Sequence, residues 1–593
     1  MKLKLALALI TIAQLLLFLL VLRRKKAEKW TVKGGVLFVC FSLFAALCAW
    51  QLTAGMTPLR PKETVTVTAL NQKNKKAKEP SIYLTDVVYE NRRTNISAEE
   101  KNGWRVRDTW LVCLSKETDF DTALNLSTNV QVPAGTGRYL TFFTNQHKGL
   151  VQVDYQEQSQ TVDCYSQQDG TVNVYLRDSD YATLHALKIR QIVMFTLFLL
   201  AFNGILLWAE LRSNPCSNGF SKENSLSLKG VAILMMLWHH LFQAQCYEGF
   251  RIYFYPLNQT LVDNIAVVTK ICVPLFAFIS GFGLLKSVIK GKEPANCDSR
   301  WVITRLYKLL KSYWFIIVLV WVITFLLDQR PVRVYGFNKS ILKGCWNMLS
   351  DFLGISTLLG QKTINATWWY QGAAVMFILL FPVLLFCFRK FGVFLTLILV
   401  CNLPRISGAG YQGGQNFITF LPAFTAGMAF AYENWFEKID QFWNKFAIPE
   451  KHTYIYLFRF VLETVALAVA YKLYFLLEAK NCWNLHFLIL PVLVILWFRR
   501  HVMQSPIRLA DTIFCYLGKH ATNIYLMHTF IRAAYMKNTT YSWEQFGVVF
   551  LFLLSASLIL SYAVEFLKKL VRYDETMDRL FAKLLVSREK TAP

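Results

Sequence analysis

Charged residues are scarce in this sequence, and acidic ones are the scarcest. They make up 17% of the 593 residues, against 54% for apolar residues, whereas a soluble domain is about 25% charged. This composition excludes an ordinary soluble enzyme and predicts many membrane-spanning helices. Lysine and arginine exceed aspartate and glutamate by 64 − 38 = 26. In a soluble protein that excess would indicate nucleic-acid binding, but here the basic residues flank hydrophobic runs, so no nucleic acid partner is expected.

Cysteine spacing of the metal-binding kind is also missing. The thirteen cysteines include no CxxC pair and no Cys/His cluster of the zinc type, so no metal is expected. Only Cys113 and Cys164, both in a polar N-terminal segment, could pair as a disulfide if that segment is extracytoplasmic. An internal repeat is not visible either, although a transporter built of inverted repeats would normally have one.

Thirteen hydrophobic spans are predicted, near residues 5–22, 36–52, 191–210, 228–246, 266–287, 306–327, 367–388, 391–404, 416–433, 453–477, 484–499, 513–534 and 546–567. The loops on one side of these spans are the basic ones. The fold class is therefore an all-α polytopic membrane protein with an inserted extracytoplasmic β domain. Charge places the N-terminus outside and the C-terminus in the cytoplasm of a cell-membrane protein. The predicted parts are two N-terminal spans (1–55), the β domain (56–188), a connecting span and cytoplasmic loop (189–223), a ten-span core (224–570) and a cytoplasmic tail (571–593).

The β domain is predicted from alternation of apolar and polar residues. The stretches SIYLTDVVYE, VQVDYQ and TVNVYLRD alternate at period two, and turn-rich stretches such as PAGTGR separate such runs. This pattern is typical of a small β-sandwich. It holds no cluster of catalytic residues, so acceptor recognition or partner contact is the role expected of it. Within the core, residues 339–360 are predicted to include an amphipathic interfacial helix on the outer side.

One apolar helix, predicted near Ser225 to Phe242, carries a lysine near its start and two histidines near its end. Ionisable groups in a membrane span are costly and usually mark a functional site. Lys229 and His240 are eleven residues apart, which returns to within about 20° of the same helix face and spans about 16 Å. His239 lies about 100° away, so the two histidines cannot face the same target equally, and His240 is the candidate site residue. The alternative is that the lysine is an interfacial anchor and the histidines bond neighbouring helices.

A second cluster of basic residues begins a later span. Arg305 and Lys308 are i, i+3 neighbours on one helix face, and Arg300 and Lys311 flank them. With Lys229 and the positive end of its helix dipole they could form an anion site suited to phosphates. The alternative is that these residues only mark the cytoplasmic side.

Five motifs in the core resemble those of the membrane acyltransferase-3 family, over about residues 224–570. They are LKGVAILMMLWHHLF (228–242), KICVPLFAFISGFGLLKS (270–287), RLYK (305–308), TWWYQGAAVMFILLFPVL (367–384) and GKHATNIYLMHTF (518–530). Lys229 and His240 fit the family's basic residue, ten intervening positions and histidine. The resemblance implies a multi-pass acyl-CoA-dependent O-acyltransferase of ten spans.

The resemblance also implies a mechanism. An acyl group, with acetyl expected, would move from cytoplasmic acyl-CoA to a hydroxyl of an extracytoplasmic glycan or cell-envelope component. His240 would act as general base, with Tyr525, Asn523 and His528 of the late span as helpers. The coenzyme phosphates would lie against Lys229, Arg305 and Lys308. Ser280 would donate a hydrogen bond, although a small residue there could equally serve close helix packing.

Two departures from the family pattern bear on the acceptor and the donor. Lys308 replaces the second arginine of a paired-arginine motif, which keeps the charge but loses the planar fork. Gln371, Ala373 and Ala374 occupy a region where polysaccharide O-acetyltransferases commonly have an acidic pair. The residues alone leave two other hypotheses open: a transporter or flippase for an envelope precursor, and a membrane sensor with a ligand-binding β domain. They do not determine the oligomeric state.

Overall fold

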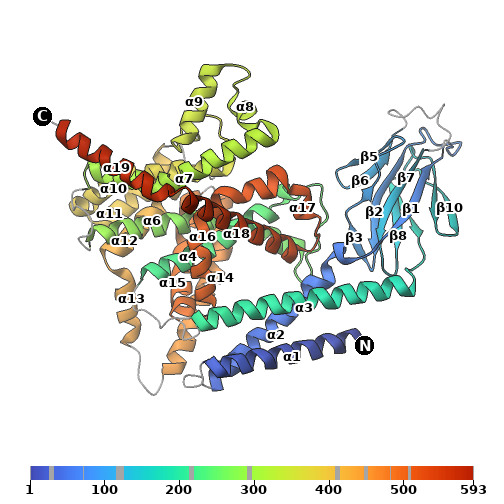
Figure 1. The fold of residues 1–593 in the computed structure, drawn as a ribbon, viewed down its shortest axis with the longest axis horizontal. Coiled ribbons are helices and arrows are strands. Elements are labelled where there is room, and N and C mark those ends of the chain that lie inside the picture. Colours follow the sequence, from blue (N-terminus) through green and yellow to red (C-terminus); the bar gives the residue numbers. More distant parts are fainter. Residues whose placement is uncertain are drawn as a thin grey trace. The chain divides into compact units, whose positions relative to one another are not determined.

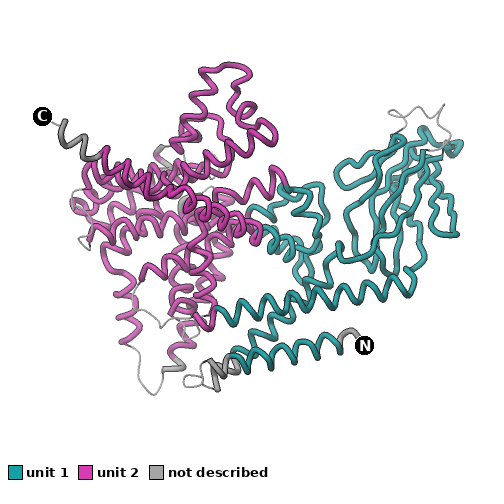
Figure 2. Tube along the Cα trace, viewed as in Figure 1, with its two compact units in different colours: residues 1–208, 240–264, 536–553 teal, residues 209–239, 265–535, 554–593 magenta. Residues whose placement is uncertain are grey.

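The fold is described from a computed structural model of residues 1–593 (Figure 1). The described residues are 2–25, 32–70, 72–114, 126–212, 220–289, 297–407, 415–445, 452–480, 482–504 and 509–591. The chain forms two compact units (Figure 2). Unit 1 comprises residues 1–208, 240–264 and 536–553, and unit 2 comprises residues 209–239, 265–535 and 554–593.

Helices make up most of the described chain, as the composition predicts. They are α1 (Lys2–Lys25), α2 (Val32–Gly55), α3 (Tyr181–Arg212), α4 (Lys222–Phe242), α5 (Gln259–Val268), α6 (Cys272–Ile289), α7 (Ser299–Asp328), α8 (Arg330–Tyr335), α9 (Ile341–Phe352), α10 (Trp369–Phe391), α11 (Val393–Ser407), α12 (Phe417–Tyr432), α13 (Trp435–Asn444), α14 (His452–Ala479), α15 (Trp483–Phe498), α16 (Leu509–Thr529), α17 (Lys537–Tyr541), α18 (Phe546–Leu570) and α19 (Tyr573–Thr591).

Nine helical segments within the described ranges are long and apolar enough to cross a membrane, and three shorter apolar helices accompany them. The fold class is confirmed: a polytopic helical protein with an N-terminal β domain. Each of the thirteen predicted spans falls on a helix, but length and composition support nine of them as full spans. The three shorter apolar helices comprise residues 5–21, 393–403 and 417–432. The remaining predicted span, in α16, is more polar and carries Asp511, Lys519, His520, Asn523 and His528.

The β domain belongs to unit 1 and is a two-sheet sandwich. Its strands are β1 (Lys62–Ala69), β2 (Ile82–Tyr89), β3 (Arg92–Thr94), β4 (Ser97–Ala98), β5 (Trp104–Arg107), β6 (Trp110–Cys113), β7 (Leu126–Pro133), β8 (Tyr139–Thr144), β9 (Leu150–Tyr155), β10 (Gln158–Asp163) and β11 (Gly170–Tyr175). One sheet has the order β10-β9-β1-β7-β4 and the other β11-β8-β2-β6-β5, with β3 paired to β2. The strands of both sheets pair antiparallel.

The inner faces of the two sheets form one core. In β1 the buried residues Val65 and Val67 alternate with residues that face outward, and Leu84 of β2 and Phe142 of β8 meet them from the other sheet. This is the period-two pattern that the sequence predicted. Cys113 and Cys164 both lie in this core. Cys164 is a thiol there, so no disulfide joins the two cysteines, and burial raises the pKa of Cys164 to about 12.

Two segments far along the chain complete unit 1 by packing on the β domain. Arg251 forms an ion pair with Asp86 at 2.6 Å, and its backbone N–H donates to Asn95 Oδ1 at 2.6 Å. The carboxylate of Glu544 accepts hydrogen bonds from Thr94 and from the backbone N–H of Asn95. The predicted outer loop after His240 and the turn before α18 are therefore fixed to the sandwich.

Close helix crossings shape unit 2. A Cβ on Gly230 of α4 would lie 1.9 Å from the Phe514 carbonyl oxygen, and one on Gly518 of α16 would lie 1.8 Å from the Leu226 carbonyl oxygen. Helices α4 and α16 can approach this closely only because both positions are glycine. The predicted interfacial helix is α9, whose exposed residues are apolar at Ile341, Leu342, Trp346 and Leu349.

Candidate active site

Helix α4 carries Lys229 and His240 as one continuous element. Ser221 precedes the helix, and its Oγ accepts a hydrogen bond from the Asn224 N–H at 3.2 Å, which caps the first turn. Both candidate residues are partly exposed rather than buried. Because no break interrupts α4 between them, their eleven-residue spacing places them on one face, about 16 Å apart along the axis.

The two histidines at the end of α4 have different surroundings. His239 is buried, and its Nδ1 lies 2.7 Å from the Ala266 carbonyl oxygen. His240 is partly exposed. Helix α4 ends two residues later, where the Tyr541 hydroxyl donates to the Leu241 carbonyl oxygen at 3.0 Å. The two histidines therefore differ in burial: His239 is enclosed beside the Ala266 carbonyl, and His240 keeps part of its surface exposed.

Tyr525 and His528 lie on α16, the helix that crosses α4 at the glycine pair. The Tyr525 hydroxyl donates to the Thr367 carbonyl oxygen at 2.9 Å. His528 is fully buried. Its Nδ1 lies 2.9 Å from the Tyr525 carbonyl oxygen, and the Thr529 hydroxyl lies 3.2 Å from its Nε2. A ring with the Nδ1–H on a carbonyl leaves Nε2 as the acceptor for that hydroxyl, so both ring nitrogens are engaged within α16.

Ser280 and Tyr525 are connected through a short series of aromatic rings. The Ser280 hydroxyl donates to the Phe276 carbonyl oxygen at 2.8 Å. The Phe276 ring lies 6.3 Å from the Tyr370 ring, and the Tyr370 ring lies 6.2 Å from that of Tyr525 in an edge-on arrangement. Helices α6, α10 and α16 therefore meet at one place, and Tyr370 is the residue there that the sequence analysis did not single out.

The sequence analysis gave close helix packing as an alternative role for Ser280, but the adjacent residue Gly281 makes that contact. A Cβ on Gly281 would lie 2.1 Å from the Phe424 carbonyl oxygen, and one on Gly427 would lie 2.1 Å from the Phe278 carbonyl oxygen. Helices α6 and α12 thus cross at this glycine pair. Ser280 itself is exposed, so its hydroxyl lies on an open face of α6 instead of in the helix contact.

The basic candidates Arg305 and Lys308 lie near the start of α7. Arg305 donates through Nη2 to Ser287 Oγ of α6 at 2.9 Å, and its guanidinium lies 5.6 Å from the Trp301 ring centre. Lys308 is exposed. Lys311, which the sequence analysis grouped with them, forms ion pairs with Asp574 at 3.2 Å and with Asp578 at 3.0 Å. Helix α19 therefore supplies two carboxylates to the Lys311 end of the basic cluster.

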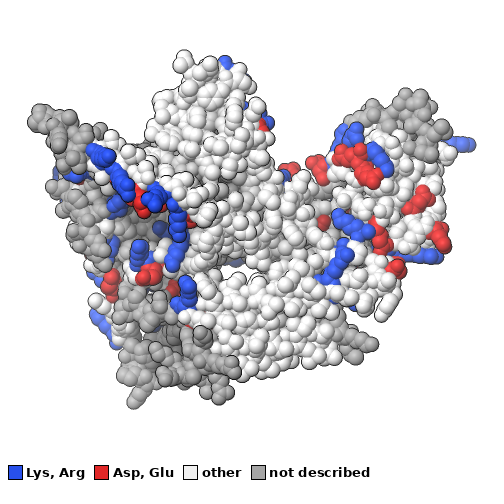
Figure 3. Space-filling view, viewed as in Figure 1, with Lys and Arg blue, Asp and Glu red and all other residues white. Residues whose placement is uncertain are grey.

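Other basic segments gather at this end of unit 2. At the end of α6, Lys286 donates to Asn434 at 3.1 Å, and Arg499 donates to Asp440 of α13 at 3.0 Å. Figure 3 shows basic side chains concentrated around α19 and α13, and a largely uncharged surface over α7 to α9. The segments that the charge rule assigned to one side of the membrane thus lie at one end of the helical unit.

A polar network between α16 and α18 went unrecognised in the sequence. The Asn523 side chain donates to Glu565 Oε1 at 2.9 Å and to Ser561 Oγ at 3.0 Å. His520 Nδ1 lies 2.9 Å from the same Ser561 hydroxyl, and Lys568 pairs with Glu565 at 3.1 Å. The signal that could have found it is the single carboxylate of Glu565 near the end of an apolar span.

Comparison with known proteins supports this assignment of elements. The family model described as an acyltransferase domain, acyltransferase-3, matches residues 227–566. That range begins two residues before Lys229 and ends one residue after Glu565, so it includes α6, α7, α10, α16 and most of α4 and α18. No curated protein and no solved structure matches the chain. The matched range covers more than half of the 593 residues, and the chain belongs to the acyltransferase-3 family of membrane acyltransferases.

Proposed function

We propose that this acyltransferase moves an acyl group, with acetyl as the expected group, from cytoplasmic acyl-CoA to a hydroxyl of an extracytoplasmic glycan or envelope component. The observation that carries the proposal is the continuity of helix α4 from Lys229 to His240. This one uninterrupted helix holds a cation and an imidazole on the same face, about 16 Å apart. The separation between Lys229 and His240 suits a donor bound at the Lys229 end of the helix and an acceptor bound at the His240 end.

The donor fits the basic end of unit 2. Coenzyme A carries phosphates, and partly exposed Arg305 and exposed Lys308 offer cations to them. Lys229 lies in the third turn of α4 and offers a further cation. Ser287 already holds the Arg305 guanidinium in place, so less side-chain freedom is lost when a phosphate binds.

The acyl transfer itself requires a base for the acceptor hydroxyl. In the proposed step, neutral His240 takes the proton from the acceptor hydroxyl as its oxygen attacks the thioester carbonyl carbon. A C–O bond forms, the C–S bond breaks, and the coenzyme thiolate leaves and receives the proton from the imidazolium. General base catalysis of this kind contributes about 10²–10⁴-fold to a rate.

The proposed topology places the N-terminus and β domain outside and the C-terminus in the cytoplasm. It is supported by the packing of residues 240–264 and 536–553 on the β domain within unit 1, because span alternation assigns all three to one side. It is also supported by the clustering of basic segments in unit 2.

A transfer assay with matched histidine variants tests the function. The purified protein is given labelled acetyl-CoA and a crude envelope glycan fraction, and label in the glycan is measured. We expect His240→Ala to reduce transfer by at least about 10²-fold and His239→Ala to retain most of it, because only His240 is placed as the base. Equal losses in folded variants would refute His240 as the base. Absence of acyl-CoA turnover by the wild-type protein would refute the transferase and favour a transporter or sensor.

A further inference from the structure

The outer face of one sheet in the β domain holds an aromatic cluster. Tyr83 of β2 stands directly beside Phe143 of β8 and Val112 of β6, since Tyr83 pairs with Val112 and Leu84 with Phe142 in the ladders. The ring centres of Trp110 and Phe143 lie 5.9 Å apart, and those of Trp110 and Tyr83 lie 6.0 Å apart. The opposite face of the same strands forms the sandwich core, so these rings are additional to what folding requires.

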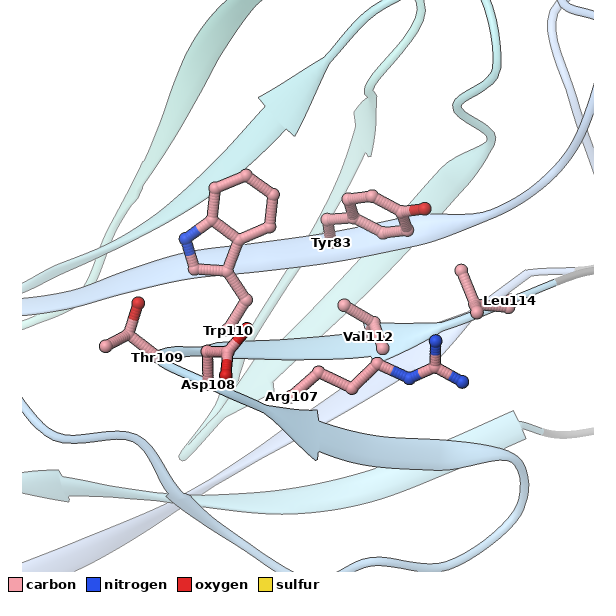
Figure 4. A pocket seen from close by; sticks show the side chains of 7 residues that line it. All are labelled: Tyr83, Arg107, Asp108, Thr109, Trp110, Val112 and Leu114. Carbon is pink, nitrogen blue, oxygen red and sulfur yellow. The ribbon is translucent and has the colours of Figure 1, made fainter. Parts of the chain in front are cut away.

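Trp110 is the most open member of this cluster. It is 37% exposed and lines a hollow of about 410 Å³ together with Arg107, Asp108 and Tyr83 (Figure 4). Lys148 lies against the Tyr83 ring, with its Nζ 3.1 Å from the ring centre. That contact covers part of Tyr83 and leaves the indole as the flat surface available to a ligand. A large aromatic side chain that stays exposed beside a hollow is typical of a binding site.

A second hollow, of about 660 Å³, lies on the other side of the same hairpin. Asp108 and Thr109 line both hollows. They form the two-residue turn between β5 and β6, because Arg107 pairs with Trp110, and Asp108 adopts the left-handed φ of +53° that such a turn requires. A chain-like ligand that lies on Trp110 can therefore continue over this turn into the second hollow.

The lining of the second hollow is rich in hydroxyl and amide groups. Asn95, Ser97, Gln131 and Asn538 are among its polar residues, and Asn95 Nδ2 has no hydrogen-bond acceptor within the described part of the chain. The charged residues that line the two hollows are Lys62, Arg107, Asp108 and Glu544, two basic and two acidic, so their formal charges cancel. Such a surface donates and accepts many hydrogen bonds without favouring an anion or a cation.

Two segments from outside the β domain also line the second hollow. Gly249 and Phe250 line it from the segment that follows His240, Asn538 lines it from α17, and Ser542 lines it from the turn between α17 and α18. All of these residues belong to unit 1 together with the sandwich. The hollow is thus formed jointly by the β domain and the segment into which the candidate base leads.

We propose that these two hollows hold a neutral oligosaccharide, the glycan acceptor of the transfer reaction; this inference rests on the proposed function for its role. One sugar ring lies with its C–H face on Trp110, because the aromatic face is negative and the C–H groups are slightly positive. The next sugars pass over Asp108 and Thr109, and their hydroxyls bond the amides and hydroxyls of the second hollow. The volumes of both hollows, about 410 and 660 Å³, fall within the range of about 300–1,000 Å³ that is typical of small-molecule sites.

A glycan array probed with the purified full-length protein tests this inference without acyl-CoA, so binding is measured separately from transfer. The array holds neutral oligosaccharides, acidic oligosaccharides and an unglycosylated peptide set. We expect binding to neutral oligosaccharides of several sugars, about ten-fold weaker in Trp110→Ala and also weakened in Gln131→Ala. The matched control is Trp346→Ala, which removes an indole that is 52% exposed on α9 and should leave binding unchanged.

The outcomes separate this inference from the proposed function. Binding that depends on Trp110, in a protein that transfers no acyl group, would support the saccharide site and refute the transferase. Transfer to a glycan with no binding that depends on Trp110 would overturn the site alone. Binding only to acidic glycans, or only to peptides, would overturn the neutral saccharide as ligand. Equal weakening by Trp110→Ala and Trp346→Ala would overturn the role of the aromatic cluster.

Discussion

Glu544 is expected to be the residue that most strongly fixes the turn before α18 to the β domain. It lies between α17 and α18 and is only 6% exposed. Its carboxylate accepts from the Thr94 hydroxyl at 2.7 Å, from the Asn95 N–H at 2.8 Å and from the Thr57 hydroxyl at 2.5 Å. Thr57 precedes β1 and Thr94 ends β3, so one side chain ties two places of the β domain to a segment about 450 residues away.

Replacing Glu544 with alanine should open this contact. The substitution leaves three donors without their acceptor, and each buried unsatisfied group costs about 1–3 kcal/mol. Because water can enter the space that the side chain leaves, we expect a total at the low end, about 3 kcal/mol. That loss would speed hydrogen exchange of the backbone amides near Thr57 and Thr94 about 150-fold, since each 1.36 kcal/mol is a factor of ten.

Hydrogen–deuterium exchange read by mass spectrometry measures this effect in the full-length protein. The matched control is Glu157→Ala, which removes an exposed carboxylate from the turn between β9 and β10 and should change exchange at neither place. Exchange in Glu544→Ala within about three-fold of the wild type would refute the reasoning. It would mean that the Arg251–Asp86 ion pair, together with the backbone hydrogen bonds that join Tyr253 to Glu544 and Phe546, holds the turn without the carboxylate.

The same side chain gives the contact a pH dependence of known sign. Burial raises the pKa of Glu544 above its ordinary value of 4.5, so the native state keeps the proton to a higher pH than the unfolded chain does. The contact is therefore at full strength below about pH 4.5 and weakens as the pH rises through the raised pKa. Glu544→Gln cannot titrate, so the difference in exchange between wild type and this variant should grow across that window. A constant difference would contradict the raised pKa.

Three further predictions concern the helical unit. Gly230→Ala should destabilise the unit by several kcal/mol in thermal unfolding, because the new Cβ would lie 1.9 Å from a backbone oxygen. Gly283→Ala, whose new Cβ would have nothing within 4 Å, should be close to neutral. Equal effects of the two substitutions would contradict the close crossing. Arg305→Ala should raise the KM for acyl-CoA, and added salt should do the same in the wild type; reduced turnover with unchanged KM would contradict a phosphate contact. In a background without reactive cysteines, Asn258→Cys should react with an impermeant thiol reagent in intact cells and Arg572→Cys should not; the reverse pattern would invert the proposed topology.

Local chemistry explains what could be predicted from the sequence. A helix that crosses a membrane needs an apolar run of sufficient length, and a half-buried strand needs alternation, so runs such as 306–327 and SIYLTDVVYE predicted α7 and β2 directly. The angular separation of His239 and His240 likewise follows from helix geometry alone. The family resemblance rests on the same kind of local information, namely Lys229 and His240 at a fixed spacing, and the match over residues 227–566 confirms it.

The candidate site was predictable only in part, because a residue's role depends on partners far along the chain. Lys311 has the same local appearance as Lys308, yet only the fold brings Asp574 and Asp578 to it. Ser280 and Gly281 are adjacent in sequence, but the approach of Phe424 decides that the glycine makes the helix contact. A carboxylate in an apolar span is rare, so the sequence could have marked Glu565 as notable. The hydrogen bond that Asn523 donates to it, however, comes from the packing of α16 on α18.

The sequence by itself determined that this is a polytopic membrane acyltransferase with a β domain, because periodicity, hydropathy and motif spacing are properties of neighbouring residues. Only the tertiary structure decided that residues 240–264 and 536–553 pack on the sandwich and form a hollow with it. Arg251 meets Asp86, and Glu544 meets Thr94, across hundreds of intervening residues. Such pairs leave no periodic pattern in the chain, because their energy comes from contacts that exist only after the segments between them have folded.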